Sequence, residues 1–182
     1  MDSRILNVVD EEGNTLGEAT RQEIHEKGLL HKEAHVWYYT PDGEIIFQHR
    51  AKDKDTYPDL LDATVGGHVE VGDNHEQTAL KEAEEETGVH IKPEELIFLC
   101  TTITNFYDAV TGMTNHPRRN VYAYRYMARL EDLKVEEGKA LGFEAWPIDK
   151  LMNLSEQDAA RFIPSIFDET GMKIIQQIRD LV

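Results

Sequence analysis

The chain has 182 residues, of which 40% are hydrophobic, and this is enough for one compact domain with a sizeable core. Asp and Glu number 35 against 19 Lys and Arg, so the formal charge at pH 7 is −16. A surface this acidic repels phosphate backbones, which excludes polymeric nucleic acid as a partner. The same acidity suits recruitment of divalent cations, although a solvated acidic surface gives the same net charge.

Cysteine content and hydropathy indicate the compartment. The single cysteine, Cys100, cannot form an internal disulfide, and its place in the apolar run LIFLC favours a small buried side chain over a reactive thiol. The sequence shows neither an N-terminal apolar stretch of signal-peptide length nor a run of 18 apolar residues. We therefore expect a cytoplasmic protein that does not associate with membranes.

The pattern up to residue 65 predicts two hairpins separated by a short connection. In the second hairpin, aromatic and β-branched residues flank the turn sequence Thr40-Pro41-Asp42-Gly43. We expect a hairpin over residues 5–19, a helical or irregular connection over 21–28, and strands over 34–40 and 44–50 on either side of the turn. Residues 51–65 are expected to be mostly loop.

The pattern after residue 89 predicts three more strands and two closing helices. The strands are expected within residues 94–108, 120–132 and 142–147, and the helices within 155–162 and 164–182. This order of elements predicts an α/β fold in which a mixed sheet carries helices on its faces. We expect a single domain over residues 1–182, made of an N-terminal hairpin and connection, a core and C-terminal helices, with bounds of 1–33, 34–151 and 152–182.

An acidic segment, GGHVEVGDNHEQTALKEAEEETGV, lies between these halves at residues 66–89. Asp73 is the expected helix cap, and Glu76 three residues later completes a capping box. The predicted helix runs from Asn74 to Thr87 and stops at Gly88.

The helix gathers like charges on one side. At about 100° per residue, Ala79 and Ala83 face the core while Glu82, Glu85 and Glu86 share one edge. Each pair of like charges costs an isolated helix roughly 0.2–0.5 kcal/mol. A divalent cation held by carboxylate oxygens would neutralise all three, whereas a solvated acidic face is the simpler alternative. The double glycine before the helix favours a metal site, because its backbone can approach a ligand closely.

These residues resemble the Nudix box, G-x5-E-x7-R-E-U-x-E-E-x-G-U, in which U is apolar. Residues 67–89 match seven of its nine fixed positions. Asp73 replaces the first glutamate and Lys81 replaces the arginine; both keep the charge, but lysine lacks the planar fork that supports a carboxylate. The resemblance implies a Nudix-type α/β/α sandwich with a mixed β-sheet.

The resemblance also implies a metal site. Glu82, Glu85, Glu86 and the Gly67 carbonyl would hold Mg²⁺, with Mn²⁺ as an alternative, and Glu82 and Glu85 would act in catalysis. Supporting roles would fall to Asp73, Lys81, Gly66 and Gly88. The implied reaction is hydrolysis of a phosphoanhydride bond in a small-molecule or nucleoside diphosphate-linked substrate. The general base stays open between Glu82 and an acid outside the box, namely Glu136, Glu137 or Glu144.

The region before the box is similar to the isopentenyl-diphosphate isomerases within the same superfamily. Those isomerases carry a catalytic cysteine just before the Gly-His pair, but residues 61–68 contain no thiol. We therefore prefer a hydrolase, with an isomerase-like enzyme or a non-catalytic nucleotide-binding regulatory domain as alternatives. Family members are often homodimers, which the sequence neither requires nor excludes.

Further candidates lie outside the box. His25, His31 and His68 resemble the metal-binding histidines of the isomerases, although surface or loop histidines are the simpler reading. His68, Arg118 and Arg119 are candidates for contact with substrate phosphate, and a solubility role at a strand edge is the alternative for the two arginines. Four aromatic residues are expected in the core rather than stacked on a base: Trp37, Tyr39, Phe106 and Tyr107.

Overall fold

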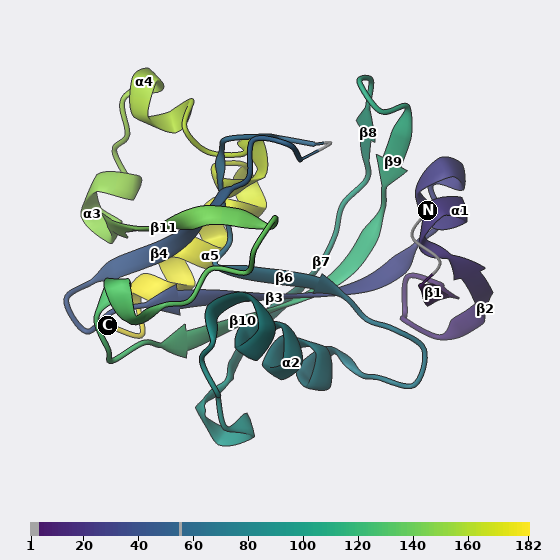
Figure 1. The fold of residues 1–182 in the computed structure, drawn as a ribbon, viewed down its shortest axis with the longest axis horizontal. Coiled ribbons are helices and arrows are strands. Elements are labelled where there is room, and N and C mark those ends of the chain that lie inside the picture. The colour runs from purple at the N-terminus through teal and green to yellow at the C-terminus, as the bar shows by residue number, and fades with distance from the viewer. Residues whose placement is uncertain (1–3, 55) are drawn as a thin grey trace.

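A computed structural model describes residues 4–54 and 56–182 (Figure 1). Its strands are β1 (Ile5–Val9), β2 (Thr15–Thr20), β3 (His31–Tyr39), β4 (Glu44–Arg50), β5 (Leu61–Asp62), β6 (Val65–His68), β7 (Ile97–Ile103), β8 (Phe106–Asp108), β9 (Met113–Asn115), β10 (Pro117–Arg125) and β11 (Ala140–Pro147). The α-helices are α1 (Arg21–Lys27), α2 (His75–Thr87), α3 (Ile148–Leu151), α4 (Glu156–Ala159) and α5 (Glu169–Arg179), and short 3₁₀ turns occur at Pro93–Glu95, Leu130–Asp132 and Pro164–Ile166.

Strand β3 is the centre of a mixed sheet. It runs parallel to β10 along its whole length, with Pro117 opposite His31 and Arg125 opposite Tyr39. Its other edge is shared between β6, which pairs with residues 33–36, and β4, which pairs with residues 38–39. The hairpin of β1 and β2 joins the same sheet through Val8 opposite His31.

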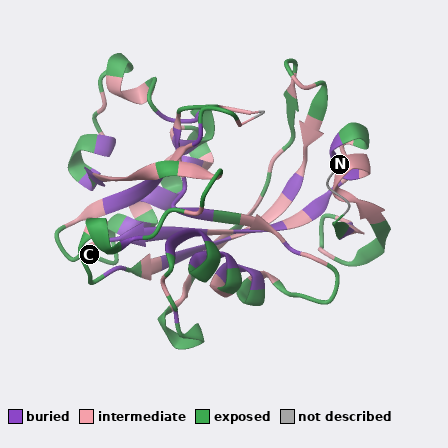
Figure 2. Ribbon diagram, viewed as in Figure 1, coloured by how far each residue is buried: buried purple, intermediate pink, exposed green. Residues whose placement is uncertain are grey.

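Two cores form because successive side chains of β3 point to opposite faces of the sheet. Val36 packs with Ala83 of α2, whereas Trp37 belongs to the core that contains Ile175 of α5. Figure 1 shows α2 and α5 on opposite sides of the sheet, and Figure 2 shows that α2 turns its buried residues toward the strands. The predicted α/β fold with a mixed sheet and helices on its faces is confirmed.

Helix α2 begins one residue later than predicted, because Asn74 rather than Asp73 is its N-cap. The Asn74 side chain accepts a hydrogen bond from the Gln77 amide at 2.9 Å, and the Gln77 side chain accepts one from the Asn74 amide at 3.0 Å. The capping box therefore exists one residue further along than expected. Gly88 ends the helix in the left-handed region, at φ 70°, as predicted.

Other elements also differ from the expectations. Residues 51–65 are mostly loop as expected, but they also contain β5, which pairs with β4, and Val65, which begins β6. The helix expected over residues 155–162 is reduced to the four residues of α4, and Asp168 caps α5. These segments are too short or too irregular to carry a clear periodicity in the sequence.

The aromatic and cysteine expectations are confirmed in part. Trp37 and Tyr39 are buried in the core, and Cys100 is half-buried against it. Phe106 and Tyr107 are exposed instead, at 44% and 62%, because β8 pairs with β9 in a separate two-stranded hairpin that projects from the sheet (Figure 1).

No helix within residues 4–54 and 56–182 has both the length and the apolar character needed to cross a bilayer.

Candidate functional site

Two glutamates of α2 meet one ammonium group. The side chains of Glu82 and Glu86 are buried, with relative exposures of 7% and 4%. Lys139 Nζ lies 3.6 Å from Glu82 Oε2, 3.4 Å from Glu86 Oε1 and 2.9 Å from Glu136 Oε2. We call the buried pair of Glu82 and Glu86 the carboxylate cluster.

The backbone of strand β6 lies against the carboxylates of this cluster. The Gly66 amide donates a hydrogen bond to Glu86 Oε2 at 3.3 Å, and Gln48 Nε2 donates to the same oxygen at 3.2 Å. A Cβ atom on Gly67 would stand 2.5 Å from the carboxyl carbon of Glu82, so a larger residue would require a shift there. The absence of a side chain at Gly67 therefore lets the strand approach Glu82, while Gly66 contacts Glu86 through its backbone amide.

Burial favours the neutral form of both helix carboxyls. It raises the pKa of Glu86 to about 7, although the charge of Lys139 opposes this. Burial also raises the pKa of Glu82, with Lys139 opposing and Glu85 adding to the effect. Carboxylates that have lost their water need a cation beside them to stay ionised, and the cluster is suited to hold one.

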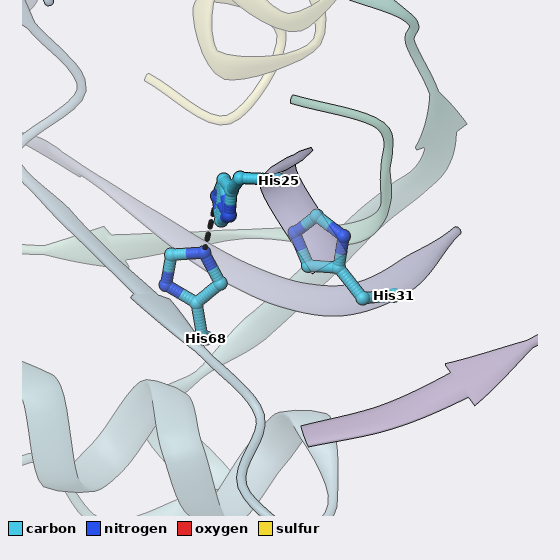
Figure 3. A group of neighbouring side chains, drawn as sticks. All are labelled: His25, His31 and His68. Atoms are coloured by element: carbon cyan, nitrogen blue, oxygen red, sulfur yellow. Dashed lines mark hydrogen bonds between the residues drawn. The ribbon is translucent and has the colours of Figure 1, made fainter. Parts of the chain in front are cut away.

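Three histidines from three elements meet at the side of the sheet away from α2. His25 of α1, His31 of β3 and His68 of β6 have ring centroids 5.2 Å apart in every pair, and Nε2 of His25 lies 3.4 Å from Nε2 of His68 (Figure 3). The Nδ1 atoms of His25 and His31 contact the backbone carbonyls of Arg21 and Leu29 at 3.2 and 3.0 Å. A ring that donates there directs the lone pair of its Nε2 toward the other rings.

Glu33 completes this group, which we call the histidine cluster. Its Oε1 lies 3.4 Å from His68 Nε2 and 3.5 Å from His31 Nε2. Its Oε2 accepts two hydrogen bonds from the Arg119 guanidinium, at 3.1 and 2.7 Å. Burial alone would raise the pKa of Glu33, but Arg119 and the nearby histidines hold it well below its usual range. Burial lowers the pKa of His68 to about 3, so the cluster combines a neutral imidazole with an ionised carboxylate.

The NUDIX domain family matches residues 29–166, which include β6, α2 and both glycines. The match covers more than half of the chain. The chain belongs to the Nudix family. An uncharacterised Nudix hydrolase of Clostridium acetobutylicum is 30% identical over 171 residues, which cover 92% of this chain and 78% of that protein. The predicted assignment to the Nudix hydrolases is thereby confirmed.

Solved structures show the same fold. DR0079 from Deinococcus radiodurans aligns with a TM-score of 0.65 at 19% identity, covering 95% of this chain and 98% of that one. A bifunctional NMN adenylyltransferase/ADP ribose pyrophosphatase of Francisella tularensis, solved with AMP and a manganese ion, aligns with a TM-score of 0.52 at 16% identity. That alignment covers 82% of this chain and 41% of the Francisella protein. At these identities the alignments establish the Nudix fold alone.

The remaining Nudix-box residues lie around the carboxylate cluster. Glu85 is exposed, whereas Glu82 and Glu86 are buried and share the Lys139 ammonium. Lys81 is also exposed, and Asp73 lies in an exposed turn where its amide donates to the Glu70 carbonyl.

The three acids considered as bases outside the Nudix box occupy different places. Glu136 reaches the cluster through Lys139, whereas Glu137 is exposed on the same turn. Glu144 accepts two hydrogen bonds from Arg161 at 2.7 and 2.8 Å, which occupy its carboxylate. Of these three acids, Glu136 is therefore the one that lies beside the carboxylate cluster, because it contacts Lys139.

The two arginines considered for phosphate contact point to opposite faces, because they are neighbours on β10. Arg118 Nε donates to the Glu11 carbonyl at 3.0 Å, near the N-terminal hairpin. Arg119 binds Glu33 and also lines a small cavity between the sheet and α5, together with His35 and Trp37. Of the two arginines, Arg119 therefore contacts both the histidine cluster and this cavity.

Sequence reasoning missed Lys139, Gln48 and Glu33. Lys139 and Gln48 approach Glu86 across 53 and 38 residues, and no local pattern marks either residue. Glu33 could have been found, because it lies two residues after His31 and strand periodicity places both side chains on one face.

Proposed function

We propose that this Nudix hydrolase cleaves a phosphoanhydride bond in a small diphosphate-containing substrate, with Mg²⁺ or Mn²⁺ bound at the carboxylate cluster. The observation that carries the proposal is the buried pair of Glu82 and Glu86. Their carboxylates share one positive group, the Lys139 ammonium, and lie beside the Gly67 backbone. Hard divalent cations prefer such oxygen ligands.

The residues fit the metal that the family uses. Glu82 and Glu86 offer carboxylate oxygens, Gly67 can add its carbonyl, and the exposed Glu85 can supply a ligand from the outer side. Manganese and AMP in the Francisella tularensis structure support a divalent metal and a nucleotide-linked substrate here. Nucleoside diphosphate derivatives such as ADP-ribose are therefore the first compounds to test.

A divalent cation bound here would polarise the diphosphate and acidify a water molecule. The water oxygen would bond to one phosphorus while the bond from that phosphorus to the bridging oxygen breaks, giving two phosphate-bearing products. We assign acceptance of the water proton to Glu82 or to Glu136, the outside acid that reaches the cluster. Glu86, held by Gln48 and the Gly66 amide, would orient the site rather than move a proton.

The test is a substrate panel assayed with Mg²⁺ and with Mn²⁺. It should contain nucleoside diphosphate derivatives, dinucleotides and prenyl diphosphates, with release of phosphate or monophosphate as the readout. Glu82→Gln and Glu85→Gln are expected to lower kcat/KM about 10²-fold or more. Glu84→Gln is the matched control, because Glu84 is exposed on another side of α2. Equal rates in all four proteins on every compound would refute catalysis at this cluster.

We also propose that the histidine cluster holds a transition metal. One ring nitrogen from each of His25, His31 and His68 supports this, because these three atoms lie within 4.8 Å of one another, and Glu33 Oε1 lies beside His31 and His68. Three of the separations are 3.4–3.5 Å, namely His25 to His68, His68 to Glu33 and His31 to Glu33, and these are close to the roughly 3.3 Å that separates two ligands of a tetrahedral zinc ion. Arg119 holds the Glu33 carboxylate in place, as outer partners do around metal ligands.

Metal analysis would test the histidine cluster separately. After dialysis against Zn²⁺ or Co²⁺, elemental analysis should find one tightly bound ion in the wild type and in Glu82→Gln, and none in His68→Ala. The exposed His90 provides the control, since His90→Ala should keep the ion. Retention of the ion by His68→Ala would place it elsewhere.

An isomerase and a non-catalytic regulatory domain are the two alternatives to a hydrolase. The missing thiol in residues 61–68 speaks against isomerisation of isopentenyl diphosphate, so we expect no deuterium exchange into that substrate in heavy water. A regulatory domain would bind nucleotides in calorimetry without metal-dependent turnover. Cytoplasmic location stays a prediction, and light scattering on the purified protein decides between a monomer and a homodimer.

A further inference from the structure

The ammonium group of Lys139 occupies the position between Glu82 and Glu86 where a divalent cation would bind. It lies within 3.6 Å of an oxygen of each carboxylate. An ammonium and a divalent ion repel each other strongly over such distances, so both cannot share these oxygens. Metal binding at this cluster therefore requires the ammonium to leave.

The backbone of Lys139 is fixed while its side chain can move. The Lys139 carbonyl accepts a hydrogen bond from the Ala51 amide at 3.2 Å, and the Lys139 amide donates to the Glu136 carbonyl at 3.1 Å. The side chain itself is 34% exposed and ends a flexible four-carbon stem. Displacement of the ammonium thus needs only rotation of the side chain.

Glu136 can keep the ammonium after its contacts with Glu82 and Glu86 have broken. Its carboxylate makes the shortest of the three contacts, 2.9 Å, and its side chain is 35% exposed, far more than those of Glu82 and Glu86. An ion pair between Lys139 and Glu136 can therefore persist at the rim after Glu82 and Glu86 have taken the metal.

We propose that Lys139 is a resident counter-ion of the carboxylate cluster. Its ammonium neutralises Glu82 and Glu86 before the metal arrives and keeps only its ion pair with Glu136 when the metal binds. This inference rests on the proposed metal site. Lys139 then sets the metal affinity, because every binding event must break two of its ion pairs, and it protects the metal-free fold from two unpaired buried charges.

Metal titration of substituted proteins tests the proposal. Calorimetric titration of metal-free protein with Mn²⁺ at pH 8 should give a Kd at least five-fold tighter for Lys139→Met than for wild type, because the competing charge is gone. Lys139→Arg keeps the charge and should remain within about two-fold of wild type. Lys173→Met, which removes an exposed lysine of α5, is the matched control and should leave the Kd unchanged. A smaller tightening in Lys139→Met, or a weaker Kd, would overturn the proposal.

A second experiment uses only the wild type and so does not depend on the folding of a variant. An amine-reactive acetylating reagent is applied with and without saturating Mg²⁺, and modification of each lysine is followed by mass spectrometry. Lys139 should react several-fold faster with Mg²⁺ present, whereas the exposed Lys173 should react equally under both conditions. An unchanged or slower reaction of Lys139 would show that it stays between the glutamates.

The two proposals fail in distinguishable ways. If the wild type binds Mn²⁺ but Lys139→Met binds it no more tightly, the counter-ion role is wrong and the metal site stands. If neither protein binds Mn²⁺ or Mg²⁺ at the cluster, both the metal site and the role of Lys139 are wrong.

Discussion

Gly67 on β6 and Glu82 on α2 approach so closely that a single added methyl group would collide with the carboxylate. A Cβ atom on Gly67 would stand 2.5 Å from the carboxyl carbon and from one oxygen of Glu82. Real side chains do not tolerate such a contact, so one of the two groups would have to move. The absence of a side chain at Gly67 therefore helps to set the position of Glu82 in the carboxylate cluster.

Gly67→Ala should displace the Glu82 carboxylate from the cluster. We expect the Mn²⁺ affinity to fall roughly ten-fold or more and the free energy of unfolding to fall by about 1–3 kcal/mol. Calorimetry and urea unfolding measure the two effects. Gly17→Ala is the control, because no atom lies within 4 Å of a Cβ at Gly17. Wild-type metal affinity in Gly67→Ala would show that the close approach does not position Glu82.

Glu86 should make the metal-free protein less stable as the pH rises toward 7. Its pKa of about 7 in the folded state lies above the ordinary value of 4.5, so the folded state binds more protons than the unfolded state between these values. The free energy of unfolding should therefore fall by about 1–3 kcal/mol as the pH rises from about 4.5 through 7, and this group should cause no further loss above about pH 8. Urea unfolding with a chelator present measures this at each pH.

Glu86→Gln should remove that part of the pH dependence and stabilise the metal-free protein at pH 8. Glu84→Gln serves as the comparison, since Glu84 is exposed and should leave the slope as it is in wild type. Identical slopes in all three proteins would contradict a raised pKa at Glu86.

Arg119→Met should destabilise the protein far more than Arg118→Met. Removal of Arg119 leaves the buried Glu33 carboxylate without its guanidinium partner, which costs about 3–5 kcal/mol in comparable buried pairs. Arg118 instead donates to a backbone carbonyl near the surface, and its loss should cost under about 1 kcal/mol. Urea unfolding at pH 7 compares the two, and equally small losses would mean that Glu33 does not depend on Arg119.

The effect of Glu136→Gln on metal affinity should depend on Lys139. With Lys139 present, loss of Glu136 removes the ion pair that would hold the displaced ammonium, and this should weaken Mn²⁺ binding several-fold. In the Lys139→Met background, Glu136→Gln should have no further effect. A double-mutant cycle of Mn²⁺ titrations measures this coupling. An equal loss in both backgrounds would instead identify Glu136 as a direct metal ligand.

Local spacing predicted the part of the carboxylate cluster that lies on one helix. Glu82 and Glu86 are four residues apart, so helical geometry alone places them together. It could not decide that Glu86 is buried while Glu85 is exposed, because that depends on where the sheet lies against α2. The position of Lys139 was beyond prediction, because it depends on the contact of its turn with Ala51 at the end of β4.

The histidine cluster was foreseen only as three separate candidates. His25, His31 and His68 come from α1, β3 and β6, and their meeting depends on how the N-terminal hairpin joins the sheet. The sequence favoured surface positions for them, whereas His25 and His31 are buried. Burial of polar groups from distant segments is a tertiary property that residue spacing does not encode.

Strand β6 places its consecutive residues Gly67 and His68 against different clusters on its two faces. Gly67 faces Glu82, and His68 faces His25 and Glu33. Deleting or inserting one residue in this short edge strand would exchange the faces of both at once, whereas a substitution would affect a single face. Length changes between Val65 and His68 should therefore be far rarer among functional descendants of this chain than replacements at the same positions.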